Sequence, residues 1–403
     1  MQLFQPITVL GIDLEFVFFA LTLVGVALFH HKTLQVALTG LTAVLIYKLF
    51  TGFNLPLHLL HEWKDLLNLF GLLIGFSILA KHFEHSGIPA KMPHYLPDDW
   101  KGGFLLLILV FILSSFLDNI AAAMIGGGVA HVVFKRRVHI GYLAAIVAAS
   151  NAGGSGSVLG DTTTTMMWID GVNAIDVVHA YAAAIPALFI FGIVASVQQH
   201  KHQPILKDGI PNAHISWKRL AATALILAGA IIANVVLEFP AVGVWLAIVL
   251  SAFVIKTEWK EAKHALPGTI FLLSLVLSAS MMPVEHLPAA SWQTAFILGF
   301  VSSVFDNIPL TKLALTQGGY DWGVLAFSVG FGGSMIWFGS SAGVAISNMY
   351  EEAKSVGQWL KNGWHVIVAY VASFAILILL LGWHPHAPHK EPKAPASEQG
   401  ESH

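Results

Sequence analysis

The chain has 403 residues, of which 56% are hydrophobic and only 11% are charged, whereas an average soluble domain carries about 25% charged residues. This composition excludes an ordinary soluble protein, because so much apolar surface exposed to water would aggregate. A formal net charge of −2 argues against a nucleic-acid partner, and the absence of cysteine excludes disulfides, thiolate metal sites and a cysteine nucleophile. These figures point to an integral membrane protein, and the long apolar stretches described next predict that it is all-α.

Membrane spans are expected wherever about 20 apolar residues follow one another. The first apolar stretch has no basic segment before it and no small-residue cleavage site, so we interpret it as a retained span and not a signal peptide. In chain order the expected spans are 8–29, 33–51, 67–82, 140–168, 176–197, 219–237, 241–255, 267–283, 322–349 and 363–382.

Two further apolar stretches, residues 103–134 and 291–317, are interrupted by polar residues. If both are re-entrant hairpins, most lysines and arginines fall on one side of the membrane, as the positive-inside rule requires. The sequence therefore predicts about ten transmembrane helices plus two hairpins in the plasma (inner) membrane, with both termini outside. Residues 52–66 are expected to form an outer amphipathic segment, 201–217 a cytoplasmic linker, and 384–403 a disordered tail rich in His and Pro.

The chain contains an internal repeat. Residues 114–120, Ser-Ser-Phe-Leu-Asp-Asn-Ile, match residues 302–308, Ser-Ser-Val-Phe-Asp-Asn-Ile, and the glycine-rich segment 151–161 matches 330–340. Each half, 1–200 and 218–383, then consists of three spans, a hairpin, an interrupted span and a last span. The first hairpin enters from the inner side and the second from the outer side, so the two repeats are inverted. Inverted repeats with glycine-interrupted helices point to a secondary transporter with a site near the midplane.

The repeated motifs supply the chemistry of a cation site. Non-helical backbone at membrane depth survives only where it is buried or lines a cavity, and unwound carbonyls together with helix ends suit a cation such as Na⁺. A carboxylate near the bilayer centre costs on the order of 3 kcal/mol and marks function. We place the metal ion, Na⁺, at Asp118, Asn119, Asp306 and Asn307. The other candidate ion- or proton-binding residues are Ser114, Ser115, Asn151, Gly153, Gly154, Asp161, Thr162, Thr163, Ser302, Ser303, Gly332, Gly333, Ser334, Ser340 and Ser341.

Simpler interpretations remain open for several of these residues. Asp and Asn commonly cap helix N-termini, and capping could be the whole role of Asp161, whose counterpart is Ser340. The threonine hydroxyls could bond to helical carbonyls. Lys312 could neutralise Asp306, but we favour a side chain that snorkels to the outer surface.

At these motifs the sequence resembles the NhaD-type sodium/proton antiporters, in the arsenite and citrate transporter-like branch of the ion transporter superfamily. The resemblance rests on Ser-Ser-Phe-Leu-Asp118-Asn119, on 151–164, on Asp306-Asn307-Ile-Pro-Leu and on Gly332-Gly333-Ser334 with 339–343, and it covers about residues 100–350. It implies a homodimer working by an elevator-type movement, with two hairpins and two broken helices around the ion. Some relatives carry arsenite, citrate or dicarboxylates.

The favoured function is Na⁺(Li⁺)/H⁺ antiport, in which the ion and the proton compete for Asp118 and Asp306. The alternative is a sodium-coupled transporter of citrate, a dicarboxylate or arsenite, which the acidic site disfavours because it would repel an anion. An intramembrane enzyme is the third hypothesis, but no base–nucleophile arrangement supports it. No cofactor and no nucleic-acid partner are expected.

Overall fold

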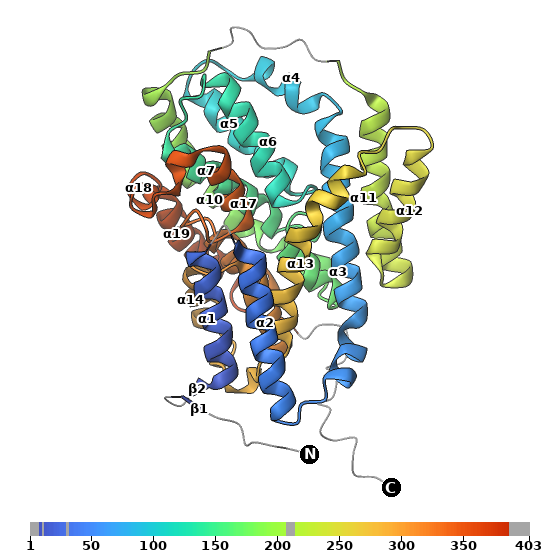
Figure 1. Cartoon of the computed structure of the whole chain (residues 1–403). Helices are drawn as coiled ribbons and strands as arrows, with labels where there is room; N and C mark the ends of the chain where they lie inside the picture. Colours follow the sequence, from blue (N-terminus) through green and yellow to red (C-terminus); the bar gives the residue numbers. More distant parts are fainter. Residues whose placement is uncertain (1–7, 10–11, 30–31, 207–213, 387–403) are drawn as a thin grey trace.

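The computed structural model describes residues 8–9, 12–29, 32–206 and 214–386 (Figure 1). The described chain is helical apart from one antiparallel pair of two-residue strands, β1 (Thr8–Val9) and β2 (Ile12–Asp13). The predicted all-α class is confirmed. The first helix begins at Leu14, so the expected span 8–29 starts six residues too early.

The helices form a chain of long and short elements. In order they are α1 (Leu14–Leu28), α2 (Thr33–Phe50), α3 (Leu55–Glu84), α4 (Ile88–Tyr95), α5 (Trp100–Ser114), α6 (Asn119–Val133), α7 (Ile140–Ser155), α8 (Thr162–Ile169), α9 (Ala174–Val178), α10 (Tyr181–His202), α11 (Trp217–Leu237), α12 (Pro240–Ala252), α13 (Lys260–Ser280), α14 (Trp292–Ser302), α15 (Asn307–Gln317), α16 (Trp322–Gly332), α17 (Ser341–Met349), α18 (Val356–Asn362) and α19 (Trp364–Leu381), with short 3-10 helices η2 (Val284–His286) and η3 (Glu351–Lys354).

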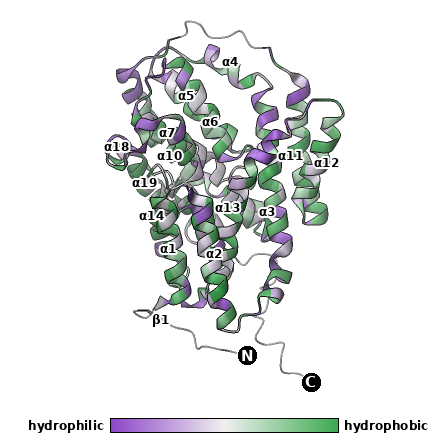
Figure 2. Ribbon diagram, in the orientation of Figure 1, coloured by the Kyte–Doolittle hydropathy of each residue, from purple (hydrophilic) through white to green (hydrophobic). Residues whose placement is uncertain are grey.

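The protein is a multi-pass membrane protein. Within the described ranges six helical segments are long and apolar enough to cross a bilayer: Thr33–Phe50, Leu55–Glu84, Ala174–His202, Trp217–Leu237, Lys260–Ser280 and Trp364–Leu381. Figure 2 shows hydrophobic residues along α1, α2, α11 and α12. Other expected spans are shorter helices: α12 has 13 residues, or about 20 Å at 1.5 Å per residue, against a hydrocarbon core of about 30 Å. The count of ten spans stays a prediction.

Helix α3 corrects one expectation. It runs without interruption for 30 residues from Leu55 and so includes residues 55–66 of the segment 52–66, which the sequence predicts to be an outer amphipathic segment. Asn54 caps it by accepting a hydrogen bond from the Leu57 N–H, and a proline in the first turn fits the helix start. The polar residues in this part of α3 suggested an amphipathic segment apart from the span at 67–82, but the structure joins both in one helix that packs against other helices.

The two stretches predicted as hairpins and the two spans predicted as interrupted each consist of two helices with a short break between them. The breaks are 115–118 between α5 and α6, 156–161 between α7 and α8, 303–306 between α14 and α15, and 333–340 between α16 and α17. The segments predicted as linker and tail are partly packed: the Leu206 N–H donates to the Val133 carbonyl, and the Trp322 indole donates to the His386 carbonyl at 2.7 Å. Residues 207–213 and 387–403 of those segments lie outside the described residues.

Helix contacts in the first part of the chain recur in the second. The pair α1–α2 packs together, as does α11–α12, and α2 contacts α13 as α12 contacts α3. Likewise α5 packs on α7 as α14 packs on α16, and α6 contacts α17 as α15 contacts α8. The central contacts are α3 with α13, α7 with α16, and α10 with α19. In Figure 1, α1–α2 lie at the lower end of the molecule and α11–α12 at the upper right, on the far side of α3 and α13.

Candidate functional site

Two aspartates begin helices at the breaks of the paired stretches. Asp118 is the N-cap of α6, where its Oδ1 accepts a hydrogen bond from the Ile120 N–H at 2.9 Å. Asp306 is the N-cap of α15 and accepts from the Ile308 N–H at 3.0 Å. Their backbone angles are nearly identical, with φ of −50° and −54°. Each carboxylate therefore lies at the positive end of a helix, where its negative charge is favoured.

Asp161 is a cap with a second partner. Its Oδ1 accepts from the Thr163 N–H at 3.0 Å and caps α8, while its Oδ2 accepts from the Asn119 side-chain amide at 3.0 Å. Asp161 is buried, with only 2% of its surface exposed. Its counterpart Ser340 caps α17 by accepting from the Gly343 N–H. Capping is therefore part of the role of Asp161 and not the whole of it.

A buried amide network joins the two halves of the chain. The Asn119 Nδ2 donates to Asn151 Oδ1 at 3.0 Å as well as to Asp161. The Asn151 Nδ2 in turn donates to the hydroxyls of Ser334, at 2.9 Å, and Ser340, at 3.1 Å. The sequence predicts these five residues separately, and the structure brings them together in one hydrogen-bonded chain.

The network is not symmetric. Asn307 follows Asp306 as Asn119 follows Asp118, yet the Asn307 Nδ2 is buried without a hydrogen-bond partner. The reason lies in the aligned positions, since Gly330 stands where the first half has Asn151, and Ser340 where it has Asp161. A Cβ placed on Gly330 would come 3.8 Å from Asp161 Oδ2, so the acidic group of the first half lies close to the second.

Several of the predicted hydroxyl ligands donate hydrogen bonds to backbone carbonyls. The hydroxyl of Ser302 donates to the Val329 carbonyl at 2.7 Å, and that of Ser303 donates to Phe300 at 2.7 Å. Ser115 donates to the Gly153 carbonyl. Ser114 Oγ and Thr163 Oγ1 are buried without a hydrogen-bond partner. Of the predicted hydroxyls, Ser341 contacts a candidate carboxylate directly, because it donates to Asp306 Oδ2 at 3.3 Å.

The glycines permit close packing more than unwinding. Gly153 and Gly154 lie inside α7, and Gly332 is the last residue of α16. A Cβ on Gly153 would come 2.0 Å from the Phe111 carbonyl oxygen, and one on Gly332 would come 2.3 Å from the Gly299 carbonyl oxygen. Gly154 and Gly333 likewise approach the carbonyls of Gly160 and Gly339. The same close approach therefore occurs in both halves.

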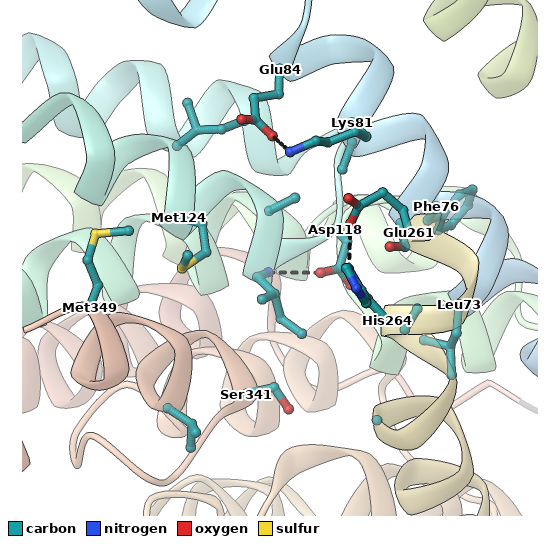
Figure 3. Close-up of a pocket in the computed structure, with 18 of the residues that line it drawn as sticks. Leu73, Phe76, Lys81, Glu84, Asp118, Met124, Glu261, His264, Ser341 and Met349 are labelled. Carbon is teal, nitrogen blue, oxygen red and sulfur yellow. Dashed lines mark hydrogen bonds and ion pairs between the residues drawn. The ribbon is translucent and has the colours of Figure 1, made fainter. Parts of the chain in front are cut away.

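Both capping aspartates line a cavity of about 900 Å³, and Figure 3 shows Asp118 within it. Its lining is mainly apolar, with residues such as Phe76, Met124 and Met349, and it includes Asp118, Asp306 and Ser341. Charged and polar residues line it near the C-terminus of α3 and the N-terminus of α13: Lys81, paired with Glu84 at 2.8 Å, Glu261 and His264. A separate small cavity is lined by Asp118, Asp161, Thr162 and Thr165 among others.

The expectation that the Lys312 side chain snorkels to the outer surface is wrong. The Lys312 ammonium lies 2.8 Å from Glu62 Oε2 of α3, and the two side chains are 8% and 13% exposed. It therefore neither snorkels to the surface nor pairs with Asp306. Residues 250 positions apart form this pair, and no local sequence signal indicates such a partner.

Comparison with known proteins gives a consistent result. The chain is 25% identical over 335 residues to sodium/proton antiporter 1 of Arabidopsis thaliana, covering 72% of this chain and 56% of that protein. It is 25% identical over 306 residues to the Na⁺/H⁺ antiporter NhaD of Vibrio parahaemolyticus, covering 61% and 72%. It is 24% identical over 342 residues to NhaD of Alkalimonas amylolytica, covering 70% and 69%.

The chain resembles the NhaD-type sodium/proton antiporters. No model of a known protein family matches it. The similarity to the NhaD-type antiporters extends beyond the stretch of about 100–350 that carries the motifs, because the alignments cover up to 72% of the chain. The match spans little more than half the length of the first plant antiporter.

Proposed function

We propose that this protein exchanges Na⁺ or Li⁺ for H⁺ across the membrane. The observation that carries the proposal is the pair Asp118 and Asp306, two helix-capping carboxylates that line one cavity of a multi-pass membrane protein. The names of the similar proteins, sodium/proton antiporters, support the same cargo.

Exchange follows from the requirement to neutralise a buried carboxylate. An isolated charge in an apolar environment is unstable unless it is paired or protonated. Either a proton or a small cation meets this requirement at Asp118 and Asp306, and the two occupants therefore exclude each other. The side-chain oxygens of Asn119 and Asn307 are the neutral ligands that would complete the Na⁺ site. Such hard oxygen donors suit an alkali cation better than a transition metal.

We further propose that the two halves are inverted repeats and that transport is of the elevator type, in a homodimer. The recurrence of helix contacts between the halves supports the repeat, as do the matched close approaches of Gly153 and Gly332. In this proposal α1–α3 and α11–α13 form a scaffold, and the helices that carry the four breaks move relative to it. The charged residues Lys81 and Glu84 at the cavity lie on the side that the positive-inside rule makes cytoplasmic.

The alternative of a sodium-coupled organic-anion transporter has less support. An anion would need a positive group in the cavity, and among the described lining residues the one lysine, Lys81, is paired with Glu84. The two capping carboxylates would repel such a substrate.

Everted membrane vesicles provide the decisive test. Addition of Na⁺ or Li⁺ should collapse a preformed pH gradient in vesicles that contain the protein, and Asp118→Asn and Asp306→Asn should each abolish the response. The matched control is Asp99→Asn: Asp99 also caps a helix, α5, but lies outside the cavity, so that variant should retain full exchange. Full activity in both site variants would contradict the proposal.

A further inference from the structure

The ion pair between Lys312 and Glu62 lies beyond the ion site when viewed from the large cavity. Helix α3 lines that cavity with Leu73, Phe76 and Lys81. Glu62 is on the same unbroken helix, 11 residues before Leu73 and 19 before Lys81, which places it roughly 17 and 28 Å further along the axis. The pair therefore joins α3 to α15 on the side of the site opposite the charged lining of the cavity.

Lys312 is mechanically connected to the candidate ion ligand. Asp306 caps α15, and Lys312 follows on the same helix six residues later, about 9 Å along its axis. If α15 moves relative to α3, Asp306 and Lys312 move together, and the contact between Lys312 and Glu62 must open.

The pair lies in buried surroundings, so separating the two charges costs free energy. Around it lies a small cavity of about 20 Å³ lined by the carboxylates of Asp65 and Asp170 and by apolar groups such as Leu66 and Leu315. A charge separated from its partner in such surroundings must acquire water or a new partner. Separating Lys312 from Glu62 therefore requires water to enter on this side, or a new partner for each charge.

We propose that Lys312 and Glu62 are positioning residues that close the site on the side opposite the cavity. They hold α15, and with it Asp306, against α3 while the cavity is open, and they separate when the site is exposed to the other side. This inference rests on the proposed transport function, because it assumes that the site alternates between two openings.

A second buried ion pair provides a matched control. Lys48 and Glu15 lie 3.1 Å apart with side chains 11% and 7% exposed, so distance and burial resemble those of Lys312 and Glu62. This pair joins α1 to α2, which pack directly on each other, and involves none of the helices at the breaks. Loss of the Lys48 pair should affect stability without shifting the opening of the site.

The first experiment measures which side of the site is open. The chain contains no cysteine, so Met124→Cys introduces a single thiol in the cavity. In oriented vesicles the protein with Met124→Cys should react with a membrane-impermeant thiol reagent from one face. Adding Lys312→Met with Glu62→Gln, which removes both charges together, should lower that rate several-fold and raise labelling from the other face. Lys48→Met with Glu15→Gln should leave both rates unchanged.

The second experiment fixes the contact covalently. A short bifunctional maleimide should link Lys312→Cys to Glu62→Cys and stop Na⁺/H⁺ exchange, whereas linking Lys48→Cys to Glu15→Cys should not.

The exchanged pair Lys312→Glu with Glu62→Lys tests the charge interaction itself. It should restore the labelling pattern of the protein with Met124→Cys alone, which a purely structural defect would not do.

Two results would overturn the inference: equal labelling changes in the two neutral double variants, or unimpaired exchange after the Lys312–Glu62 link. Labelling does not depend on the identity of the cargo. Failure of sodium/proton exchange in the unmodified protein would therefore overturn the proposed function without deciding the role of this pair.

Discussion

Asn119 and Asn307 occupy matching positions after two capping aspartates, but their amides have different surroundings. The Asn119 amide donates two buried hydrogen bonds, to Asn151 and Asp161, whereas the Asn307 amide nitrogen has no hydrogen-bond partner. In the first half of the site, side chains of the protein therefore accept hydrogen bonds from the asparagine amide, whereas in the second half the asparagine amide nitrogen has no hydrogen-bond acceptor. Buried donors without partners are uncommon and often mark functional sites.

We expect Asn119→Ala to destabilise the protein more than Asn307→Ala. Removing Asn119 leaves Asp161 Oδ2 and Asn151 Oδ1 without their donor, which costs roughly 1–3 kcal/mol for a buried group, whereas Asn307→Ala removes an amide nitrogen that is already unpaired. Thermal unfolding in detergent, without Na⁺, measures the difference. Equal destabilisation by the two variants would contradict the observed asymmetry.

The contact between His286 and Asp13 should make stability depend on pH. His286 lies in η2, and its hydrogen bond to Asp13 raises the pKa of the imidazole above its usual 6.5, with smaller contributions from the charges of Asp13, Glu285 and Glu15. A raised pKa means that the contact stabilises the fold when His286 is protonated, below about pH 6.5, and that this stabilisation is lost as the pH rises through the raised value.

Asp13→Asn should therefore lower the unfolding temperature at about pH 5.5 and have little effect at about pH 9. Asp99→Asn, at a cap that contacts no histidine in the described hydrogen bonds, should show no such change with pH. A constant difference between Asp13→Asn and the unmodified protein across this range would argue against the titration of His286.

At the scale of helices, the four breaks could be predicted from the sequence, but their packing could not. Polar and glycine residues inside apolar stretches locate the breaks within a few residues, because a continuous helix facing lipid would contain apolar residues at those positions. The full length of α3 was not predicted, because Glu62 and its polar neighbours resemble an amphipathic segment outside the span 67–82. Burial of Glu62 depends on Lys312, a partner 250 residues away, and one sequence carries no signal for that contact.

The role of the repeated glycines also required the structure. Substitution of Gly153 by alanine would place a methyl group 2.0 Å from the Phe111 carbonyl oxygen, and α5 and α7 would have to separate. Overpacking of this kind costs about 1–3 kcal/mol, so Gly153→Ala and its counterpart Gly332→Ala should lower the unfolding temperature and impair exchange.

Gly128→Ala is the matched control in the same protein. Gly128 lies in α6, and a Cβ there meets nothing within 4 Å. Alanine favours a helix over glycine by roughly 1 kcal/mol, and the variant should be as stable as the parent or more so. Tolerance of Gly153→Ala to the same degree would show that α5 and α7 are not closely packed in solution.

At the scale of the whole molecule, the proposed topology makes a prediction about sidedness. If 103–134 and 291–317 are re-entrant, the residues before and after each stretch lie on the same side of the membrane. Single cysteines at Lys101 and Arg136 should both react with an impermeant reagent from the cytoplasmic side. Those at Glu285, before the second stretch, and at Thr316, in its last helical turn, should react from the outside. Labelling of Lys101→Cys and Arg136→Cys from opposite sides would mean that the first stretch spans the membrane once.

The connection from Asn151 to Ser334 and Ser340 also has a consequence in time. The bonded side chains are 183 and 189 residues apart in the chain, and a ribosome adds about 5–20 residues per second. Roughly 10 to 40 seconds therefore pass between the synthesis of Asn151 and the synthesis of Ser334 and Ser340. Throughout that interval the first half is inserted with an unfinished polar centre, and this network can form only when the second half arrives.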